Sequence, residues 1–348
     1  MNKKEKPDFT NLRPNGSYLD DLTGFANLIG SMDEAEAAAE KLLRETDKIQ
    51  RNWKESEKNT IASEKTLDKE MPEKPDVNML LAELDSLVGL KKIKENVRSL
   101  INLVKVRKLR QENDLPIPSM SLHLVFMGNP GTGKTTVARL IAKLYYAIGV
   151  LSKGQLVEVD RAGLVAGFVG QTAMKTGEVI KSALGGVLFI DEAYSLVPSG
   201  DGGNDFGREA IETLLKAMED NRDDLVVIVA GYENLMEQFI LSNPGLESRF
   251  NRYFLFEDYS ESELYSIFVS MCEKNGYTLE NTAEEFAKLY FTQMYENRDE
   301  NFGNARDVRN LFENIISVQA DRVSGIEEPV KTDLMTIIRE DIEKAGLL

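Results

Sequence analysis

The chain has 348 residues, of which 42% are hydrophobic, and its formal net charge at pH 7 is -16. The length predicts two or three domains. The acidic balance disfavours non-specific binding to nucleic acid or to an anionic membrane, because both require a positive face. Cys272 and His123 are the only residues of their kinds, which excludes an intrachain disulfide, a thiolate metal cluster and any mechanism with paired histidines.

The residue composition also bears on the cellular compartment of the protein. No stretch approaches the roughly 20 apolar residues of a membrane-spanning helix. The positive charges at the N-terminus are not followed by the apolar run of a secretory signal. A lone cysteine fits a reducing compartment, in which Cys272 serves as a small buried apolar residue. We therefore expect no membrane insertion and a cytoplasmic protein in which His123 is structural.

Residues 1–78 are predicted to form a helical N-terminal appendage and a linker. Apolar residues recur at helical spacing from Leu19 to Met32 and again from Ala35 to Trp53. Two short amphipathic helices cannot bury these faces alone, so they pack on each other, on the next domain or on a partner. The pattern fits a solvated appendage and a partner-docking module equally. The charged, proline-bearing segment 63–78 is typical of a linker.

Residues 79–258 alternate between strand and helix patterns, which predicts a large α/β domain with a parallel five-stranded sheet. Near-continuous apolar runs are typical of parallel strands covered on both faces. The five expected strands are 122–128, 155–160, 187–192, 225–231 and 253–258, and helices between them include 136–148, 172–183 and 208–220.

The remaining residues, 259–348, carry no strand signal and predict a small all-helical domain. Ser260 provides an N-cap for the first helix. The four expected helices are 261–275, 283–296, 304–323 and 332–345.

A glycine-rich loop directly follows the first apolar run. It reads G-x-x-x-x-G-K-T, the strand, loop and helix order of a nucleotide phosphate site, rather than of a plain glycine turn. Its amide dipoles and the start of the next helix are suited to hold a polyphosphate. The predicted ATP-binding residues are Gly128, Asn129, Pro130, Gly131, Thr132, Gly133, Lys134, Thr135 and Thr136. Lys134 is expected to reach the β and γ phosphates and Thr135 to ligate Mg²⁺.

Two carboxylates end the apolar run 187–192. An apolar strand ending in acids is a weak signal alone, but downstream of a phosphate loop it indicates hydrolysis. Asp191 is expected to hold Mg²⁺ through its water shell, and Glu192 to polarise the water that attacks the γ phosphate.

These motifs, taken together, resemble those of one ATPase family. The segments that carry the resemblance are the phosphate loop, 186–196, 230–232, 243–250 and 303–306. In combination they are similar to the AAA+ ATPases of the CbbX and stage V sporulation protein K group, which also includes the ATPase domain of the type VII secretion chaperones. The resemblance covers roughly residues 80–323 and leaves the first 78 residues unassigned.

The resemblance implies a ring, usually a homo-hexamer, and further site residues. Arg249 matches the arginine finger that completes a neighbouring subunit's site, with Arg252 as a second candidate; as bare sequence, Arg249 pairs with a surface carboxylate. Arg306 matches the lid arginine that contacts the phosphates of its own subunit. Val88 and Gly89 match the segment that packs against adenine.

The chain departs from the broader superfamily after its fourth strand. Where many members carry an asparagine or threonine sensor, this chain has Gly231 and Tyr232, followed by Glu233 and Asn234. The residue that contacts the γ phosphate or the attacking water is therefore left open.

Phe168, Val169 and Gly170 resemble the pore loop of substrate-threading rings. An exposed aromatic residue flanked by glycines grips a polypeptide without reading its sequence, whereas in an isolated chain Phe168 reads as core. Segment 198–207 is either a second pore loop or a flexible connector.

The sequence thus predicts an ATP-hydrolysing ring motor that remodels a partner protein, without nucleic acid as a partner. Two alternatives belong to other classes: a nucleotide-gated assembly module and, less favoured by the acidic charge, a nucleic-acid loader. The identity of the partner protein is not encoded in any motif.

Overall fold

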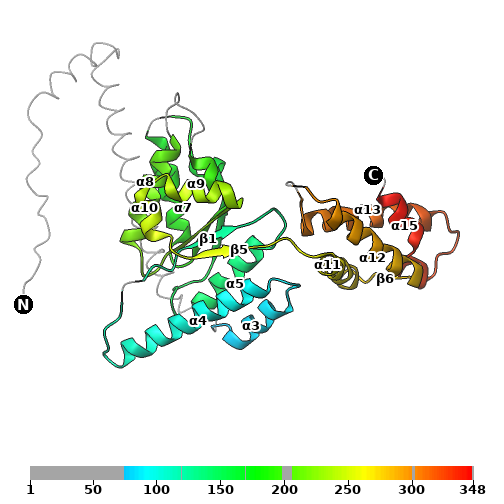
Figure 1. Cartoon of the computed structure of the whole chain (residues 1–348), viewed down its shortest axis with the longest axis horizontal. Coiled ribbons are helices and arrows are strands. Elements are labelled where there is room, and N and C mark those ends of the chain that lie inside the picture. Colours follow the sequence, from blue (N-terminus) through cyan, green and yellow to red (C-terminus); the bar gives the residue numbers. More distant parts are fainter. Residues whose placement is uncertain (1–73, 119, 169, 198–205, 300–301, 347–348) are drawn as a thin grey trace, which may run out of the picture. The chain divides into compact units, whose positions relative to one another are not determined.

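The computed structural model describes residues 74–118, 120–168, 170–197, 206–299 and 302–346. The predicted N-terminal helices, Val169 and most of segment 198–207 lie outside the described residues. From Lys74 onwards the chain forms a parallel five-stranded α/β domain followed by a helical lid, which confirms the predicted fold class (Figure 1). Throughout the described ranges, no helix is long and apolar enough to cross a membrane.

Two helices precede the sheet. Helix α3 (Val77–Ser86) begins where the Asp76 side chain accepts the Asn78 backbone N–H, so the predicted linker ends slightly before residue 78. Helix α4 (Lys91–Glu112) follows after Leu90, whose φ of 57° lies in the left-handed region. The buried side of α4 recurs at helical spacing and consists of Ile93, Val97, Leu100, Ile101 and Val104.

The sheet consists of β1 (Leu124–Met127), β2 (Leu156–Val159), β3 (Val187–Ile190), β4 (Val226–Gly231) and β5 (Tyr253–Leu255). The strand order is β2-β3-β4-β1-β5 and every pairing is parallel. Phe126 of β1 lies opposite Ala230 of β4 and Phe254 of β5. The carboxyl ends of the strands therefore meet at one edge, where ligands of open parallel sheets bind.

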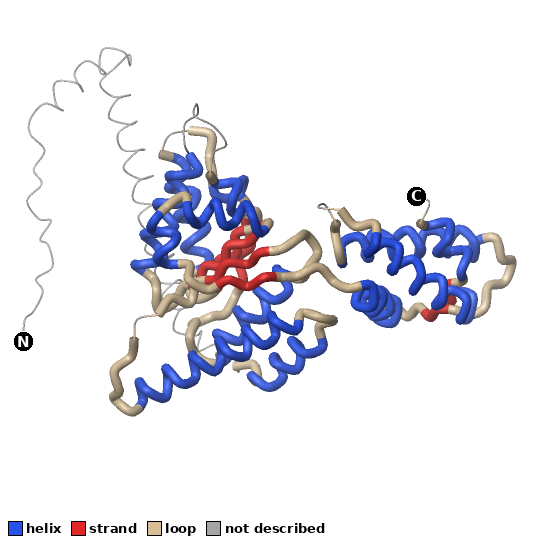
Figure 2. Tube along the Cα trace, viewed as in Figure 1, coloured by secondary structure: helices blue, strands red, loops and turns tan. Residues whose placement is uncertain are grey.

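Helices cover both faces of this sheet, as Figures 1 and 2 show. Helix α5 (Lys134–Ala147) packs with α3 and α4 against one face, which receives Leu124 and Phe126. The other face receives Val125 and is covered by α7 (Gln171–Ala183), α8 (Phe206–Asp220), α9 (Glu233–Leu241) and the short α10 (Pro244–Arg249). Two short elements, α6 (Arg161–Leu164) and the 3-10 helix η1 (Ala193–Leu196), follow β2 and β3.

The lid contains α11 (Glu261–Lys274), α12 (Asn281–Glu296), α13 (Ala305–Ser324), α14 (Lys331–Met335) and α15 (Arg339–Ala345). Ser260 caps α11 in a capping box with Glu263, as its position predicts.

The prediction of one helix over 332–345 is wrong, and the lid is not wholly helical. A two-residue strand, β7 (Thr336–Ile337), interrupts that segment and pairs in parallel with β6 (Thr278–Leu279). Asp341, buried in the lid, accepts the Ile338 N–H and hydrogen bonds from Nε and Nη2 of Arg322, which fixes the start of α15. Strands of two residues are too short to show alternation in the sequence.

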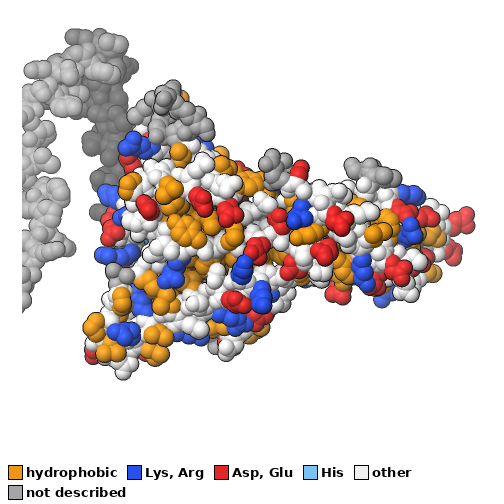
Figure 3. Space-filling model, in the orientation of Figure 1, with side chains coloured by type: hydrophobic (Ala, Val, Ile, Leu, Met, Phe, Trp, Pro, Cys, Tyr) orange, Lys and Arg blue, Asp and Glu red, His pale blue; other side chains and the backbone are white. Residues whose placement is uncertain are grey.

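The surface in Figure 3 mixes acidic and basic side chains, with hydrophobic side chains gathered near the C-terminal end of α4. Leu103, Val106 and Leu109 of that helix are exposed. The core therefore holds the first part of α4 and leaves its last turns in solvent.

Candidate nucleotide-binding site

The glycine loop lies at the carboxyl end of β1 and leads directly into α5. Gly128, Gly131 and Gly133 all have positive φ values, of 145°, 71° and 94°. Such backbone conformations favour glycine, which explains the residue type at these three positions. Gly133 is the N-cap of α5 and offers no side-chain cap, so the first amide groups of the helix are left for an anionic ligand.

Lys134 is the first residue of α5, and its side chain folds back over the loop. Its Nζ donates to the carbonyl oxygens of Gly128 and Asn129, each at 2.8 Å. Burial lowers the pKa of Lys134 to about 8; the Asp191 carboxylate opposes that shift and the Arg306 guanidinium adds to it. The ammonium is thus charged at neutral pH and held by carbonyls that a phosphate is able to replace.

The two carboxylates follow β3 at the same edge of the sheet. The Asp191 N–H donates to Val159 O at 2.8 Å, which extends the pairing of β2 and β3 by one residue. The Glu192 N–H donates to the Asp191 side chain at 3.0 Å. Glu192 has φ 48° and ψ 41°, a left-handed conformation that costs a non-glycine residue about 1–2 kcal/mol. The exposed Glu192 side chain is held in an unusual backbone conformation at the site.

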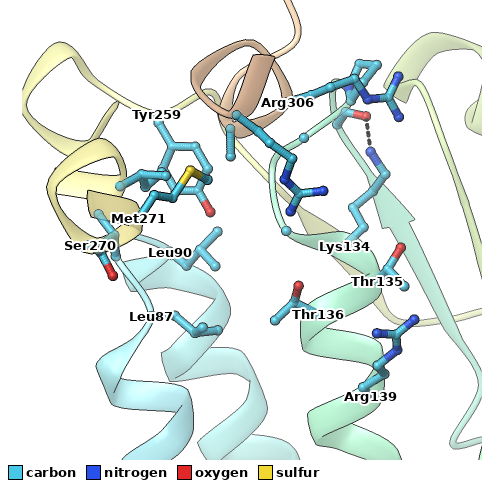
Figure 4. Close-up of a pocket in the computed structure, with 18 of the residues that line it drawn as sticks. Leu87, Leu90, Lys134, Thr135, Thr136, Arg139, Tyr259, Ser270, Met271 and Arg306 are labelled. Atoms are coloured by element: carbon cyan, nitrogen blue, oxygen red, sulfur yellow. Dashed lines mark hydrogen bonds between the residues drawn. The ribbon is translucent and has the colours of Figure 1, made fainter. Parts of the chain in front are cut away.

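A pocket of about 610 Å³ collects these groups. Figure 4 shows Arg306 reaching from the lid toward Lys134 at one end, and Leu87 and Leu90 facing Tyr259 and Met271 at the other. Its lining includes Val88, Gly128, Pro130, Gly131, Gly133, Lys134, Thr135, Thr136, Asp191, Glu192 and Arg306. The volume suits a nucleotide-sized ligand.

Three predicted binding residues do not line the cavity. Asn129 and Thr132 lie within the loop, where the Thr132 hydroxyl donates to Asn129 O at 2.8 Å. Gly89 has φ 61°, and a Cβ there would come within 2.4 Å of the Glu263 carboxylate. The neighbouring Val88 is the one that faces the cavity.

The lid contacts the phosphate loop directly. The Ala305 N–H donates to Gly131 O at 3.3 Å, and the Tyr259 hydroxyl donates to Thr132 O at 3.3 Å. A Cβ on Gly131 would come within 2.1 Å of Gly303 O. Gly131 is therefore a point of close backbone approach between lid and loop as well as a bend in the loop.

A buried amide and a carboxylate complete this junction. Asp258 accepts from the side-chain amides of Asn129 at 3.0 Å and Asn304 at 2.7 Å. The side-chain Oδ1 of Asn304 accepts the Tyr259 N–H at 2.9 Å. Asn304 is fully buried and has a positive φ of 52°. The network joins the loop, the end of the sheet and the start of α13.

Several lining residues were missed by the sequence analysis. Arg309 lies one turn after Arg306 on α13, and Arg139 lies on α5; their helical spacing from predicted residues was the available signal. Ser270, Met271 and Lys274 of α11 carried no such signal, because their presence depends on how the lid packs. Among residues 231–234, Gly231 and Tyr232 line the pocket.

The two arginines at 249 and 252 lie away from this pocket. Arg249 ends α10, and its guanidinium bonds Glu219 at 3.2 Å, with its Nε buried and unpartnered. Arg252 donates to the Met120 sulfur at 3.1 Å. Neither arginine lines the cavity of its own chain.

Phe168 lies on the loop between α6 and α7 and is 72% exposed, so it does not belong to the core. Gly170 has φ 79°, and a Cβ at Gly167 or Gly170 would meet no atom within 4 Å. Phe168 and the two glycines therefore lie at an open surface.

A parallel sheet, a glycine loop with a lysine at a helix start, paired carboxylates and a covering lid define a P-loop nucleotide hydrolase. Residues 124–258 match the ATPase family associated with various cellular activities (AAA), and residues 260–346 match the AAA lid domain. The chain belongs to the AAA family, binds nucleotide and hydrolyses ATP.

Three relatives confirm the predicted membership of the CbbX and stage V sporulation protein K group. Stage V sporulation protein K of Bacillus subtilis is 44% identical over 75% of this chain and 80% of that protein. Protein CbbX of Cereibacter sphaeroides is 44% identical over 76% and 85%. The chloroplastic ribulose bisphosphate carboxylase/oxygenase activase of Cyanidioschyzon merolae is 43% identical over 78% and 92%.

Among solved structures, a RuvB variant of Thermotoga maritima matches with a TM-score of 0.52 and 17% identity, over 76% of this chain and 71% of that one. At this identity the likeness concerns the fold.

Proposed function

We propose that this chain is one subunit of a homo-oligomeric ring of six, which uses ATP hydrolysis to remodel a partner protein in an activase- or chaperone-like manner in the cytoplasm. The observation that carries the proposal is the position of Arg249. It matches the family's arginine finger, yet it lies on α10 outside the pocket of its own chain. A finger so placed serves a neighbouring subunit.

Within one subunit the roles follow from the pocket. Lys134 exchanges its two loop carbonyls for the β and γ phosphates, and Arg306 reaches the phosphates from the lid. Glu192 polarises the attacking water, and Tyr232, a residue of the same cavity lining, is the proposed partner that holds this water. The apolar end, with Val88 and Leu90, takes the adenine ring.

Mg²⁺ fits the same arrangement. Thr135 and Asp191 both line the cavity and carry oxygen ligands, a hydroxyl and a carboxylate, and Mg²⁺ prefers a few such ligands together with phosphate oxygens and water. The described residues contain no cluster of three or more acidic, histidine or cysteine ligands, so a dedicated protein cage is not the basis of the site. When bound, the ion neutralises charge that develops on the phosphates.

The Phe168 loop is the proposed point of contact with substrate. An aromatic ring with 72% of its surface in solvent and open glycines on both sides is suited to press on an extended polypeptide. The names of the relatives mark an activase and a sporulation protein as members of this group, and we propose a protein substrate here too.

Subunit mixing tests the shared site. Glu192→Gln and Arg249→Ala proteins are each expected to bind ATP and to lose hydrolysis by more than about 100-fold. In a 1:1 mixture about a quarter of the interfaces regain both groups, so roughly a quarter of wild-type turnover should return. Arg252→Ala tests the second candidate finger, and this protein is expected to hydrolyse ATP without mixing if Arg249 is the finger.

Failure of the mixture to recover any turnover, or full activity of the Arg249→Ala protein alone, would contradict the shared site. Sedimentation with ATP and the Glu192→Gln protein checks the six-subunit assembly directly.

A further inference from the structure

Arg161 connects two parts of the molecule that the proposed motor has to couple. It is the first residue of α6, directly after β2, and its Nη1 donates to Ser195 O at 2.5 Å. A Cβ on Gly207 would come within 2.9 Å of that Nη1 and 1.9 Å of Leu196 O. The half-buried guanidinium is therefore wedged between α6, η1 and the start of α8.

Ser195, the acceptor of the Arg161 bond in η1, is linked to Glu192 by the backbone of that short helix. Glu192 is the N-cap of η1, and the Ser195 N–H donates to Glu192 O at 2.8 Å. Glu192 is held in a left-handed conformation, one that a non-glycine residue leaves readily when its surroundings change. Because Ser195 is bonded to Glu192 within η1, a backbone change at Glu192 would displace Ser195 O.

The α6 end of the bond leads into the Phe168 loop. Three side chains of α7 hold the backbone between α6 and the loop: Lys175 Nζ donates to Ala162 O at 2.6 Å and Val165 O at 3.0 Å, the Thr176 hydroxyl donates to Leu164 O at 3.0 Å, and the Thr172 hydroxyl accepts the Ala166 N–H at 3.1 Å.

Beyond this base the Phe168 backbone is held by a bond from the Gln171 N–H to Phe168 O at 3.2 Å, while its side chain is exposed. Phe168 is 72% exposed and Met174, in the first turns of α7, is 69% exposed. Because these bonds join α6, the base of the loop and the start of α7, a displacement at Arg161 would be carried toward Phe168.

We propose that Arg161 is a positioning residue that transmits the nucleotide state of Glu192 through η1 to the Phe168 loop. This inference rests on the proposed contact of that loop with substrate. Arg161 does not line the nucleotide pocket, so it acts on the loop and not on ATP. Its charge-assisted bond to a backbone carbonyl is a rigid tie that a flexible apolar side chain cannot replace.

A tryptophan reporter tests the tie in the full-length chain. Trp53 is the only tryptophan, so a Trp53→Phe, Phe168→Trp, Glu192→Gln protein reports on position 168 alone and binds ATP without turnover. Acrylamide quenching of this reporter is compared with ATP and with ADP, with and without Arg161→Met. Arg98→Met, which removes an exposed arginine paired with Asp85, is the matched control.

With Arg161 present, quenching is expected to differ between ATP and ADP. Arg161→Met should shrink that difference at least about fivefold, while the affinity for each nucleotide stays within about twofold. Arg161→Lys keeps one donor and should restore part of the difference. This variant also serves as the test if the methionine variant does not fold, as judged by thermal unfolding.

Two outcomes overturn the inference and separate it from the proposed function. An undiminished difference in both Arg161 variants would leave the Phe168 loop nucleotide-responsive and remove Arg161 from the route. No difference between ATP and ADP in the parent reporter, with the Glu192→Gln protein saturated, would overturn both the coupling and the motor role of the loop.

Discussion

His123 allows a stability prediction that is specific because the chain has no other histidine. Its ring is buried just before β1, where Nδ1 accepts the Val227 N–H at 3.0 Å and the ring centroid lies 6.0 Å from that of Phe250. Burial, together with the nearby Arg249 charge, lowers the pKa of His123 to about 4 from its usual 6.5. The folded protein therefore holds this imidazole neutral.

The direction in which stability changes with pH follows from proton binding. Between pH 6.5 and 4 the unfolded chain binds a proton at His123 that the folded chain does not, so stability falls as the pH falls through this range. With these two pKa values, the contribution lost between pH 7 and pH 5 is about 2 kcal/mol. His123→Asn keeps an acceptor for the Val227 N–H and removes the titration.

The assay is urea unfolding of both proteins at pH 7 and pH 5. The variant is expected to be less stable at pH 7, because it loses ring packing against Phe250, but its stability should fall by about 2 kcal/mol less than that of the wild type on acidification. The carboxylates titrate alike in the wild type and the variant, so their contributions cancel when the two losses of stability are compared. Equal losses within about 0.5 kcal/mol would refute the assignment of a neutral buried His123.

Further predictions concern the loop, the lone thiol and the loop lysine. Gly131→Ala should weaken ATP binding at least about tenfold, because the new Cβ collides with Gly303 O. Gly276→Ala is the control: Gly276 has a similar φ of 75° but open space around it, so this change should cost only about 1 kcal/mol of stability and leave ATP binding unchanged. Calorimetry compares the ATP affinities of the two variants. Burial raises the pKa of Cys272 to about 12, so Ellman's reagent should find no reactive thiol in the native protein and one after unfolding; rapid native labelling would contradict this. Burial lowers the pKa of Lys134 to about 8, so ATP affinity should fall about tenfold from pH 7 to pH 9, and a flat profile would count against a titrating Lys134.

The local parts of the site were predictable because their chemistry is contained in consecutive residues. The glycines, the lysine and the threonine of the G-x-x-x-x-G-K-T pattern, after an apolar run, identify the loop without any long-range information. The same holds for Asp191 and Glu192, which follow an apolar strand. The five strands were predictable because buried parallel strands are apolar on both faces.

Short elements were not predictable, for the opposite reason. The two-residue pairing of β6 with β7 divides what the sequence presents as one helix, and β7 is contacted by Arg322, which donates to Thr336 O across 14 residues of sequence. A strand of two residues is too short to show the alternation of apolar and polar residues by which strands are predicted.

What the sequence alone determined is the phosphate loop, the paired acids, the α/β class and the family, because each depends on neighbours along the chain. Only the tertiary structure decided how these parts are joined. The Tyr259 hydroxyl meets Thr132 O across 127 residues, and Arg161 meets Ser195 O across 34. Such contacts depend on the packing of the lid and of η1, since a residue's partners in space are set by the whole core and not by its neighbours in sequence.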